Sequence, residues 1–149
     1  MGKKLTNEQK RRNKIIHNVT SKKNYLDKED HRAIKDVFLE KFILCEIPTK
    51  AALSFYYAQN GESKDVDSIE MAYTTIRAAL KKSGYEPDDN MLKKVFKANE
   101  KRGERSVRDL RNGIVHDLNV RDMMEVMERK NELFKLLDDY YEILIQPIE

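Results

Sequence analysis

The sequence predicts an all-α fold, a compact bundle of about six or seven helices that forms a single domain over residues 1–149. Charged residues make up 37% of the chain and hydrophobic residues 40%, whereas glycine (5) and proline (3) together supply only eight positions. This composition is rich in helix formers and poor in turn residues. No alternating apolar run between turn residues predicts a strand, and 149 residues suit one domain better than two.

Two helices are expected before residue 48. Thr6 is a residue type that caps helices, so the first helix begins there and runs to about Val19, with a polar loop at 20–24. Asp27 opens a longer helix, which Pro48 ends because proline lacks the N–H that a helix interior needs. The apolar positions of the two helices are Ile15, Ile16 and Val19, then Ile34, Val37, Phe38, Phe42, Leu44 and Cys45.

The middle of the chain is expected to hold three shorter helices. Capping residues mark their starts, and turns that contain glycine close the first two. The expected helices run from Thr49 to Tyr57 (before the turn QNG at 59–61), from Asp65 or Asp67 to Gly84, and from the start signal EPDD at 86–89 through Phe96.

The C-terminal third begins with an expected flexible connection at 97–106. Ser106 and Asp109 resemble a capping box, and they open a helix whose apolar residues recur at helical spacing. Asn119 ends that helix or marks a bend. Asp122 then caps the last and longest helix, which runs nearly to the C-terminus.

Several functional classes are excluded by composition. The single cysteine, Cys45, forms no internal disulfide, no apolar run is long enough to span a bilayer, and the basic, polar start is not a signal peptide, so we expect a cytoplasmic protein. One cysteine and three scattered histidines lack the spacing of a zinc site, and no phosphate-binding glycine loop or nucleophile elbow is present. We therefore expect neither a metal nor a cofactor.

The net charge of +3 is unevenly distributed. Residues 1–24 carry eight basic residues against one acidic residue, and residues 93–111 carry eight against three. Residues 122–149 carry eight acidic residues against three basic ones. This polarity permits a positive surface that meets phosphates, although charge runs taken alone are better explained as solvated helix faces.

The stretch LRNGIVHDL at 110–118 places an arginine, an amide and an imidazole on one helix. At about 100° per residue, Asn112 and His116 lie about 40° apart, whereas Arg111 lies about 140° from His116. Gly113 costs about 1 kcal/mol relative to alanine inside a helix, so we expect another element to pack closely there. The same spacing recurs in RNKIIH at 12–17, which offers Arg12 and His17.

The hexapeptide RNGIVH at 111–116, followed by a long C-terminal helix, resembles the HEPN domain family, whose hallmark is an arginine, a polar residue, a few variable residues and a histidine. The resemblance implies a compact helical bundle that pairs as a two-fold homodimer and brings two motifs into one cleft. Many members are metal-independent endoribonucleases, often toxins or effectors of antiviral defence, and others are inactive binding scaffolds. An antitoxin or a larger defence protein is a further implied partner. Some toxins of this family carry a tyrosine two residues after the histidine, where this chain has Leu118.

The resemblance implies that Arg111, Asn112 and His116 are the catalytic residues. Their chemistry supports this independently, because an imidazole titrates near neutral pH and a guanidinium binds phosphate through two donors. Upstream basic residues could extend the RNA-binding surface, although solvated charges explain them equally well. They are Lys101, Arg102, Arg105 and Arg108.

Two other classes of function remain open from the sequence. A catalytically silent helical module would bind RNA or a protein through the same cleft. A plain helical adaptor would be favoured if intrachain packing buried the motif face. The intact pair Arg111 and His116 favours the enzyme.

Overall fold

The computed structural model describes residues 4–62, 65, 69–97 and 103–146. Within these ranges the chain forms seven α-helices and no strand, as the sequence predicts. The helices are α1 (Asn7–Leu26), α2 (His31–Gln59), α3 (Tyr73–Lys82), α4 (Asp89–Phe96), α5 (Val107–Asp117), α6 (Val120–Glu128) and α7 (Lys130–Leu144).

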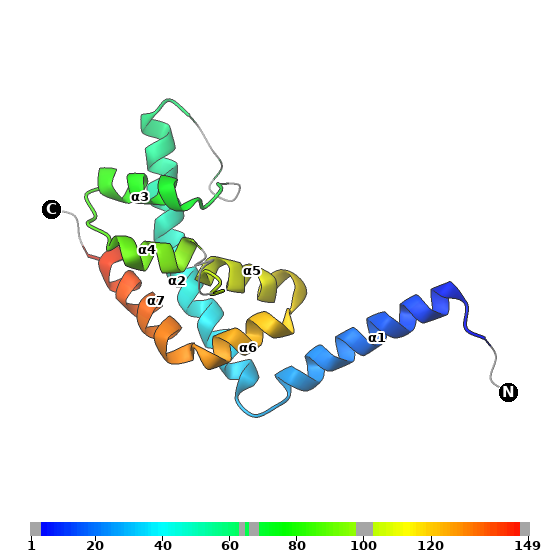
Figure 1. Cartoon of the computed structure of the whole chain (residues 1–149). Coiled ribbons are helices and arrows are strands. Elements are labelled where there is room, and N and C mark those ends of the chain that lie inside the picture. Colours follow the sequence, from blue (N-terminus) through cyan, green and yellow to red (C-terminus); the bar gives the residue numbers. More distant parts are fainter. Residues whose placement is uncertain (1–3, 63–64, 66–68, 98–102, 147–149) are drawn as a thin grey trace.

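Helix α2 is the central element of the bundle (Figure 1). It packs against α7 along one side and also contacts α3, α5 and α6. Its core side chains are spaced by three, four or seven residues, so they share one face of the helix. Large side chains that are fully buried in the core include Phe38, Phe42, Leu53, Ile76, Leu80, Leu92, Leu110, Ile114, Leu133, Leu137 and Tyr140.

Pro48 does not end a helix, which corrects the expectation from the sequence. Helix α2 continues through Pro48 for 29 residues in all. Thr49, expected to be a cap, lies inside the helix and is fully buried. Its hydroxyl donates to the carbonyl of Cys45 at 2.7 Å and lies 2.6 Å from the hydroxyl of Tyr140 on α7. Packing on α7 therefore outweighs the roughly 3 kcal/mol that proline costs inside a helix.

Helix α1 is longer than expected and projects from the bundle as an arm (Figure 1). Thr6 caps it with a reciprocal capping box to Gln9, as predicted. The expected loop at 20–24 is helical, and Asp27 is the C-cap of α1 rather than the start of the next helix. All residues from 7 to 21 are exposed, so the arm meets the bundle only near its C-terminal end.

In the middle segment, the turns lie where the sequence predicts them, whereas some of the helix starts do not. Gly61 and Gly84 both have positive φ, at 79° and 91°, which explains the glycines at the ends of α2 and α3. Helix α3 begins only at Tyr73, whereas Asp65 or Asp67 was expected to open it. Residues 69–72 are not helical, and Asp67 lies outside the described residues.

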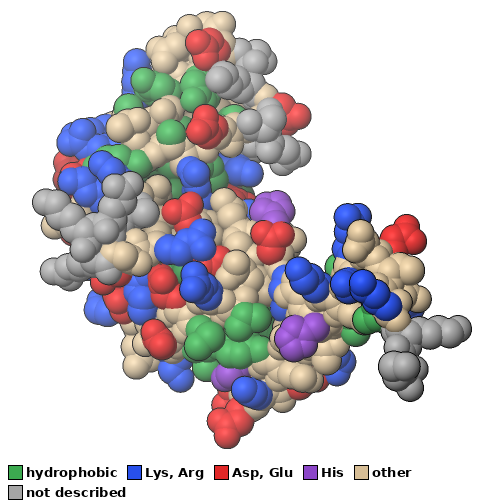
Figure 2. Space-filling model, turned by 45° about the vertical axis from the view of Figure 1, so that its right-hand side comes forward, with side chains coloured by type: hydrophobic (Ala, Val, Ile, Leu, Met, Phe, Trp, Pro, Cys, Tyr) green, Lys and Arg blue, Asp and Glu red, His purple; other side chains and the backbone are tan. Residues whose placement is uncertain are grey.

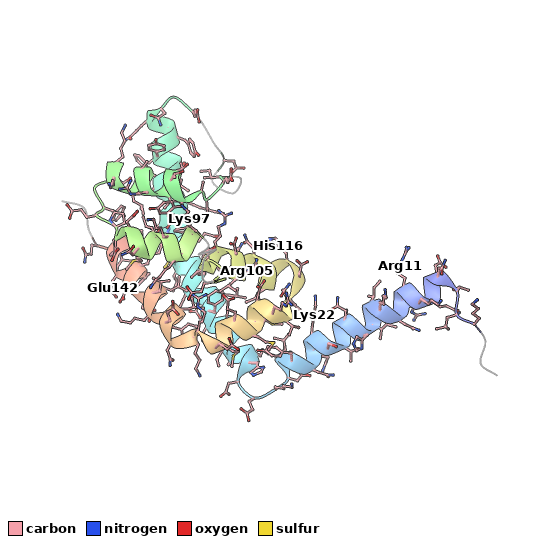
Figure 3. All side chains as sticks on the ribbon, in the orientation of Figure 1. Arg11, Lys22, Lys97, Arg105, His116 and Glu142 are labelled. Atoms are coloured by element: carbon pink, nitrogen blue, oxygen red, sulfur yellow. The ribbon has the colours of Figure 1, made fainter. Side chains whose placement is uncertain are left out.

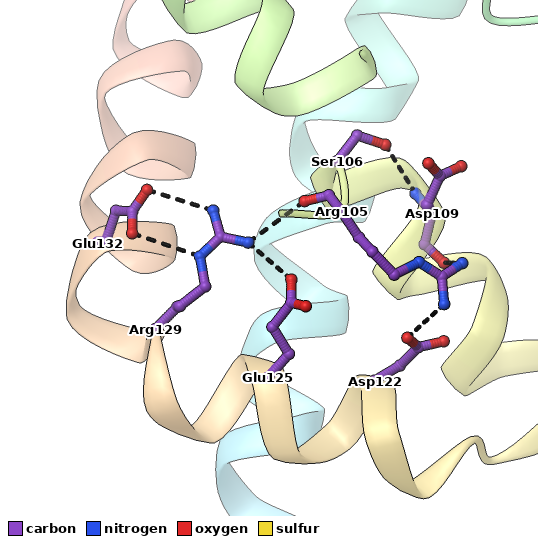
Figure 4. A network of polar contacts seen from close by, with 7 residues as sticks. All are labelled: Arg105, Ser106, Asp109, Asp122, Glu125, Arg129 and Glu132. Carbon is purple, nitrogen blue, oxygen red and sulfur yellow. Dashed lines mark hydrogen bonds and ion pairs between the residues drawn. The ribbon is translucent and has the colours of Figure 1, made fainter. Parts of the chain in front are cut away.

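The expected single C-terminal helix is two helices, α6 and α7, that meet at Arg129. The guanidinium of Arg129 binds Glu125 at 2.7 Å and Glu132 at 3.2 Å. It also donates to the backbone carbonyl of Arg105 at 3.2 Å (Figure 4). These contacts join both helices and the segment before α5, which stabilises the corner. Helix α7 remains a long C-terminal helix of 15 residues.

None of the helices in the described ranges is both long and apolar enough to cross a bilayer.

Candidate functional site

The predicted motif lies on α5, an 11-residue helix that is fixed at both ends. The Ser106 side chain accepts a hydrogen bond from the N–H of Asp109 at 3.1 Å, as the sequence predicts for a cap. Leu118 closes the helix in the left-handed conformation, and the N–H of Asn119 donates to the carbonyl of Gly113 at 3.1 Å. The Asn119 side chain then caps α6, so α5 and α6 are joined by a tight corner.

The close approach predicted at Gly113 comes from the side chain of Asp122 on α6. A Cβ at Gly113 would lie 1.7 Å from Oδ2 of Asp122, which is impossible without movement. Glycine is therefore needed here for space rather than for an unusual φ. Asp122 was expected to cap a helix. It lies instead in the first turn of α6, and Asn119 is the cap.

Asp122 is a buried carboxylate with an incomplete set of partners. Its Oδ1 accepts from Arg105 at 2.5 Å, while its Oδ2 has no hydrogen-bond partner (Figure 4). Burial raises the pKa of Asp122, and the nearby Arg105 guanidinium opposes that rise. The pair ties the start of α5 to the start of α6 and so holds the helix that carries the motif.

The side chain of Arg111 extends from α5 towards α2. Its guanidinium lies 5.5 Å from the centre of the Phe42 ring and 3.8 Å from Oε1 of Glu46, both on α2. It also donates to Oδ1 of Asn112 at 3.0 Å. Its Nε is buried and has no hydrogen-bond partner. The contact with Glu46 is long, so the donors of this guanidinium are not saturated by the chain.

His116 lies one turn beyond Asn112 and is exposed on the outer side of α5 (Figure 3). In the described part of the chain it has no hydrogen-bond or ion-pair partner. The structure therefore joins Arg111 to Asn112 but leaves His116 without a contact to either. This agrees with the wide angle between Arg111 and His116 that helical geometry predicts.

The two described residues of the expected basic track upstream of the motif both make contacts within the chain. Arg108 donates to the backbone carbonyl of Met71, and Arg105 binds Asp122 and the carbonyl of Asp109. These contacts anchor α5 to its neighbours. Lys101 and Arg102 lie outside the described residues.

The second copy of the spacing, with Arg12 and His17, lies on the arm helix α1, where both residues are exposed. Lys22 on the same helix donates to the carbonyl of Asp117, next to His116 in sequence, so the root of the arm meets the C-terminal end of α5 (Figure 3). An open notch separates the arm from the bundle (Figure 2). Lys22 was not singled out from the sequence, because its partner lies 95 residues away.

Phe42 and Glu46, the neighbours of Arg111, were also missed as site residues. Phe42 was predicted only as a core residue, and no sequence signal relates position 46 to position 111. Among the described residues, no group of three or more histidine, cysteine, aspartate or glutamate side chains is arranged to hold a metal ion.

Comparison with known proteins gives no relative. No family model matches the chain, no curated protein matches it, and no solved structure matches it.

Proposed function

We propose that the chain is a metal-independent endoribonuclease of the HEPN type, and that it cleaves RNA as a homodimer. The observation that carries the proposal is that one helix bears both Arg111, whose guanidinium donors are not all used within the chain, and His116, which is exposed and without a hydrogen-bond or ion-pair partner among the described residues. The resemblance of RNGIVH to the family motif adds the expectation of a toxin or antiviral effector, held by an antitoxin or a larger defence protein.

The reaction is transesterification of an RNA phosphodiester. The imidazole of His116 takes the proton from the 2′-hydroxyl, whose oxygen then attacks phosphorus and displaces the 5′-oxygen. Arg111 stabilises the charge on the phosphorane, and Asn112 holds the guanidinium through its side-chain carbonyl. The His116 of a second protomer protonates the leaving oxygen. The products are a 2′,3′-cyclic phosphate and a 5′-hydroxyl.

The test compares His116→Ala with His17→Ala on the same RNA. His17 is the matched control, since it ends the second copy of the spacing and is also exposed. Wild type and His17→Ala should produce fragments that end in 2′,3′-cyclic phosphate in the presence of a chelator. His116→Ala should lose about 10²–10⁴-fold in rate. Intact RNA with the wild type would overturn the proposal.

A second candidate is an inactive scaffold that binds RNA or a protein through the same face. The internal partners of Arg105 and Arg108 favour it, because these two arginines are already used to hold the fold. Binding of RNA by the wild type without cleavage, and equal binding by His116→Ala, would support this candidate.

A further inference from the structure

The central helix α2 carries an apolar stripe that no described residue covers. The stripe consists of Val37, Leu44, Ile47, Ala51 and Phe55, and the side chains of Ile47 and Phe55 are 64% and 69% exposed. Its members recur at intervals of three, four or seven residues, so they form one seam about 27 Å long on the side away from the core. An exposed apolar stripe of this length on an otherwise charged surface indicates a protein–protein interface.

The arm helix α1 carries a second apolar patch without a partner. Ile15, Ile16 and Val19 are 58%, 49% and 60% exposed. Leu26 lies two turns beyond Val19 on the same face, and there it is buried against the bundle. The face that anchors the root of the arm therefore continues outward as exposed apolar surface. A helix with so little packing is marginal in water, so the arm needs a partner surface.

The root of the arm directs it away from the α2 stripe of its own chain. The rings of Tyr25 and His31 lie 4.3 Å apart between centres and are tilted by 40°, and His31 Nδ1 lies 2.9 Å from the carbonyl oxygen of Tyr25. Lys22 donates a hydrogen bond to the carbonyl of Asp117 at the C-terminal end of α5. These contacts fix the exit of α1, and the arm points outward (Figure 1). A second copy of the chain is the occupant that suits both exposed surfaces.

The charges of the two surfaces are complementary. Helix α1 carries six basic residues and one acidic residue. Arg12 stands in line with Ile15 and Val19, at intervals of three and four residues. On α2, Glu40 lies within the stripe, and Asp138 of α7 lies beside it, paired to Lys41 but 58% exposed. Contact between Arg12 of the arm and the exposed Glu40 of the stripe would add an ion pair to the apolar packing.

We propose that two copies of the chain exchange arms, so that Ile15, Ile16 and Val19 of each copy pack on the α2 stripe of the other. The exchange makes the same contact twice around a two-fold axis, which closes the assembly at two copies. The inference concerns how two copies of the chain pair, and it does not rest on RNA cleavage. Its test measures mass and contact alone.

The first measurement is the solution mass of the full chain by light scattering after gel filtration. The wild type should be a dimer, and Ile15→Glu and Ile47→Glu should each convert it to a monomer whose helical bundle still unfolds cooperatively on heating. Ser21→Glu is the matched control, because residue 21 is exposed on the opposite side of α1 from Val19. It should remain a dimer. A monomeric wild type, or a Ser21→Glu variant that dissociates as readily as Ile15→Glu, would overturn the proposal.

The second measurement identifies which surfaces meet. Chains with Val19→Cys and chains with Ile47→Cys should form a disulfide with one another when mixed and oxidised. Cys45 does not interfere, because it is buried and burial raises the pKa of its thiol to about 12. Crosslinking of Ile47→Cys with itself alone, or a disulfide within one chain in the double variant, would overturn the exchange. An assembly larger than two copies would overturn it as well.

Discussion

The side chain of Asp122 on α6 occupies the space that a Cβ at Gly113 on α5 would need. The contact explains why the motif helix contains a glycine at its centre. It also connects the motif to the corner between α5 and α6, where Asn119 caps one helix as the other ends. The geometry around Arg111 and His116 thus depends on a side chain that lies outside the motif.

Gly113→Ala should destabilise the fold by about 1–3 kcal/mol, because the new methyl group displaces Asp122. The measurement is the free energy of unfolding in urea. In an Asp122→Ala background the same change should become neutral or stabilising, by up to about 1 kcal/mol, since only the helix propensity of alanine remains. Equal effects of Gly113→Ala in both backgrounds would contradict the contact.

The pH dependence of stability should carry the signature of Asp122. Its folded pKa is raised above the usual value of 3.8, so the folded state binds more protons than the unfolded state between these two values. Its contribution to stability is present below about pH 4 and is lost as the pH rises through the folded pKa. The slope is at most about 1.4 kcal/mol per pH unit.

Asp122→Asn removes this titration while it keeps the shape of the side chain. The stability of the variant minus that of the wild type should rise with pH above about 4, as measured by urea unfolding at a series of pH values. A difference that stays flat would show that folding does not raise the pKa of Asp122, and a difference that falls would show that folding lowers it.

The buried hydroxyl pair of Thr49 and Tyr140 should stabilise the fold. Because the Thr49 hydroxyl donates to Cys45, Tyr140 donates to Thr49. Thr49→Val leaves the Tyr140 hydroxyl buried without an acceptor and should cost about 1–3 kcal/mol. Tyr140→Phe should lower the free energy of unfolding by less than Thr49→Val does. The loss in the double variant should be smaller than the sum of the two single losses. Strict additivity in urea unfolding would contradict the pairing.

The helices themselves were largely predictable from local signals. The caps at Thr6, Ser106 and the EPDD segment, and the glycine turns after α2 and α3, are properties of neighbouring residues, and the structure confirms them. Local rules were wrong where long-range contacts dominate. Pro48 lies within a helix because Thr49 packs on Tyr140, and the last helix is divided at Arg129, which bridges three segments.

The surroundings of the candidate site were not predictable from the sequence. The helical repeat predicted that Arg111 and His116 point in different directions. The cost of a glycine inside a helix indicated that another group packs closely at residue 113. That neighbour, Asp122, and the α2 residues beside Arg111 come together only through the fold. The expected RNA-binding role of Arg105 and Arg108 could not be weighed from the sequence, since their partners Asp122 and Met71 are distant in the chain.

RNA cleavage should need the planar guanidinium of Arg111, with its two parallel N–H donors, as well as its positive charge. Arg111→Lys keeps the charge but loses the second donor and the fit over Phe42, so RNA cleavage should fall by about 10²-fold or more. Thermal melting of the variant separates this loss from unfolding. Wild-type cleavage rates in Arg111→Lys would show that only a positive charge is required there.

The most direct test of the proposed site is the ratio of cleavage rates between His17→Ala and His116→Ala, measured on one RNA with a chelator present. We expect His17→Ala to cleave at the wild-type rate and His116→Ala to be slower by at least about 10²-fold, with products that end in 2′,3′-cyclic phosphate. Equal rates in the two variants would contradict the assignment of the site to α5.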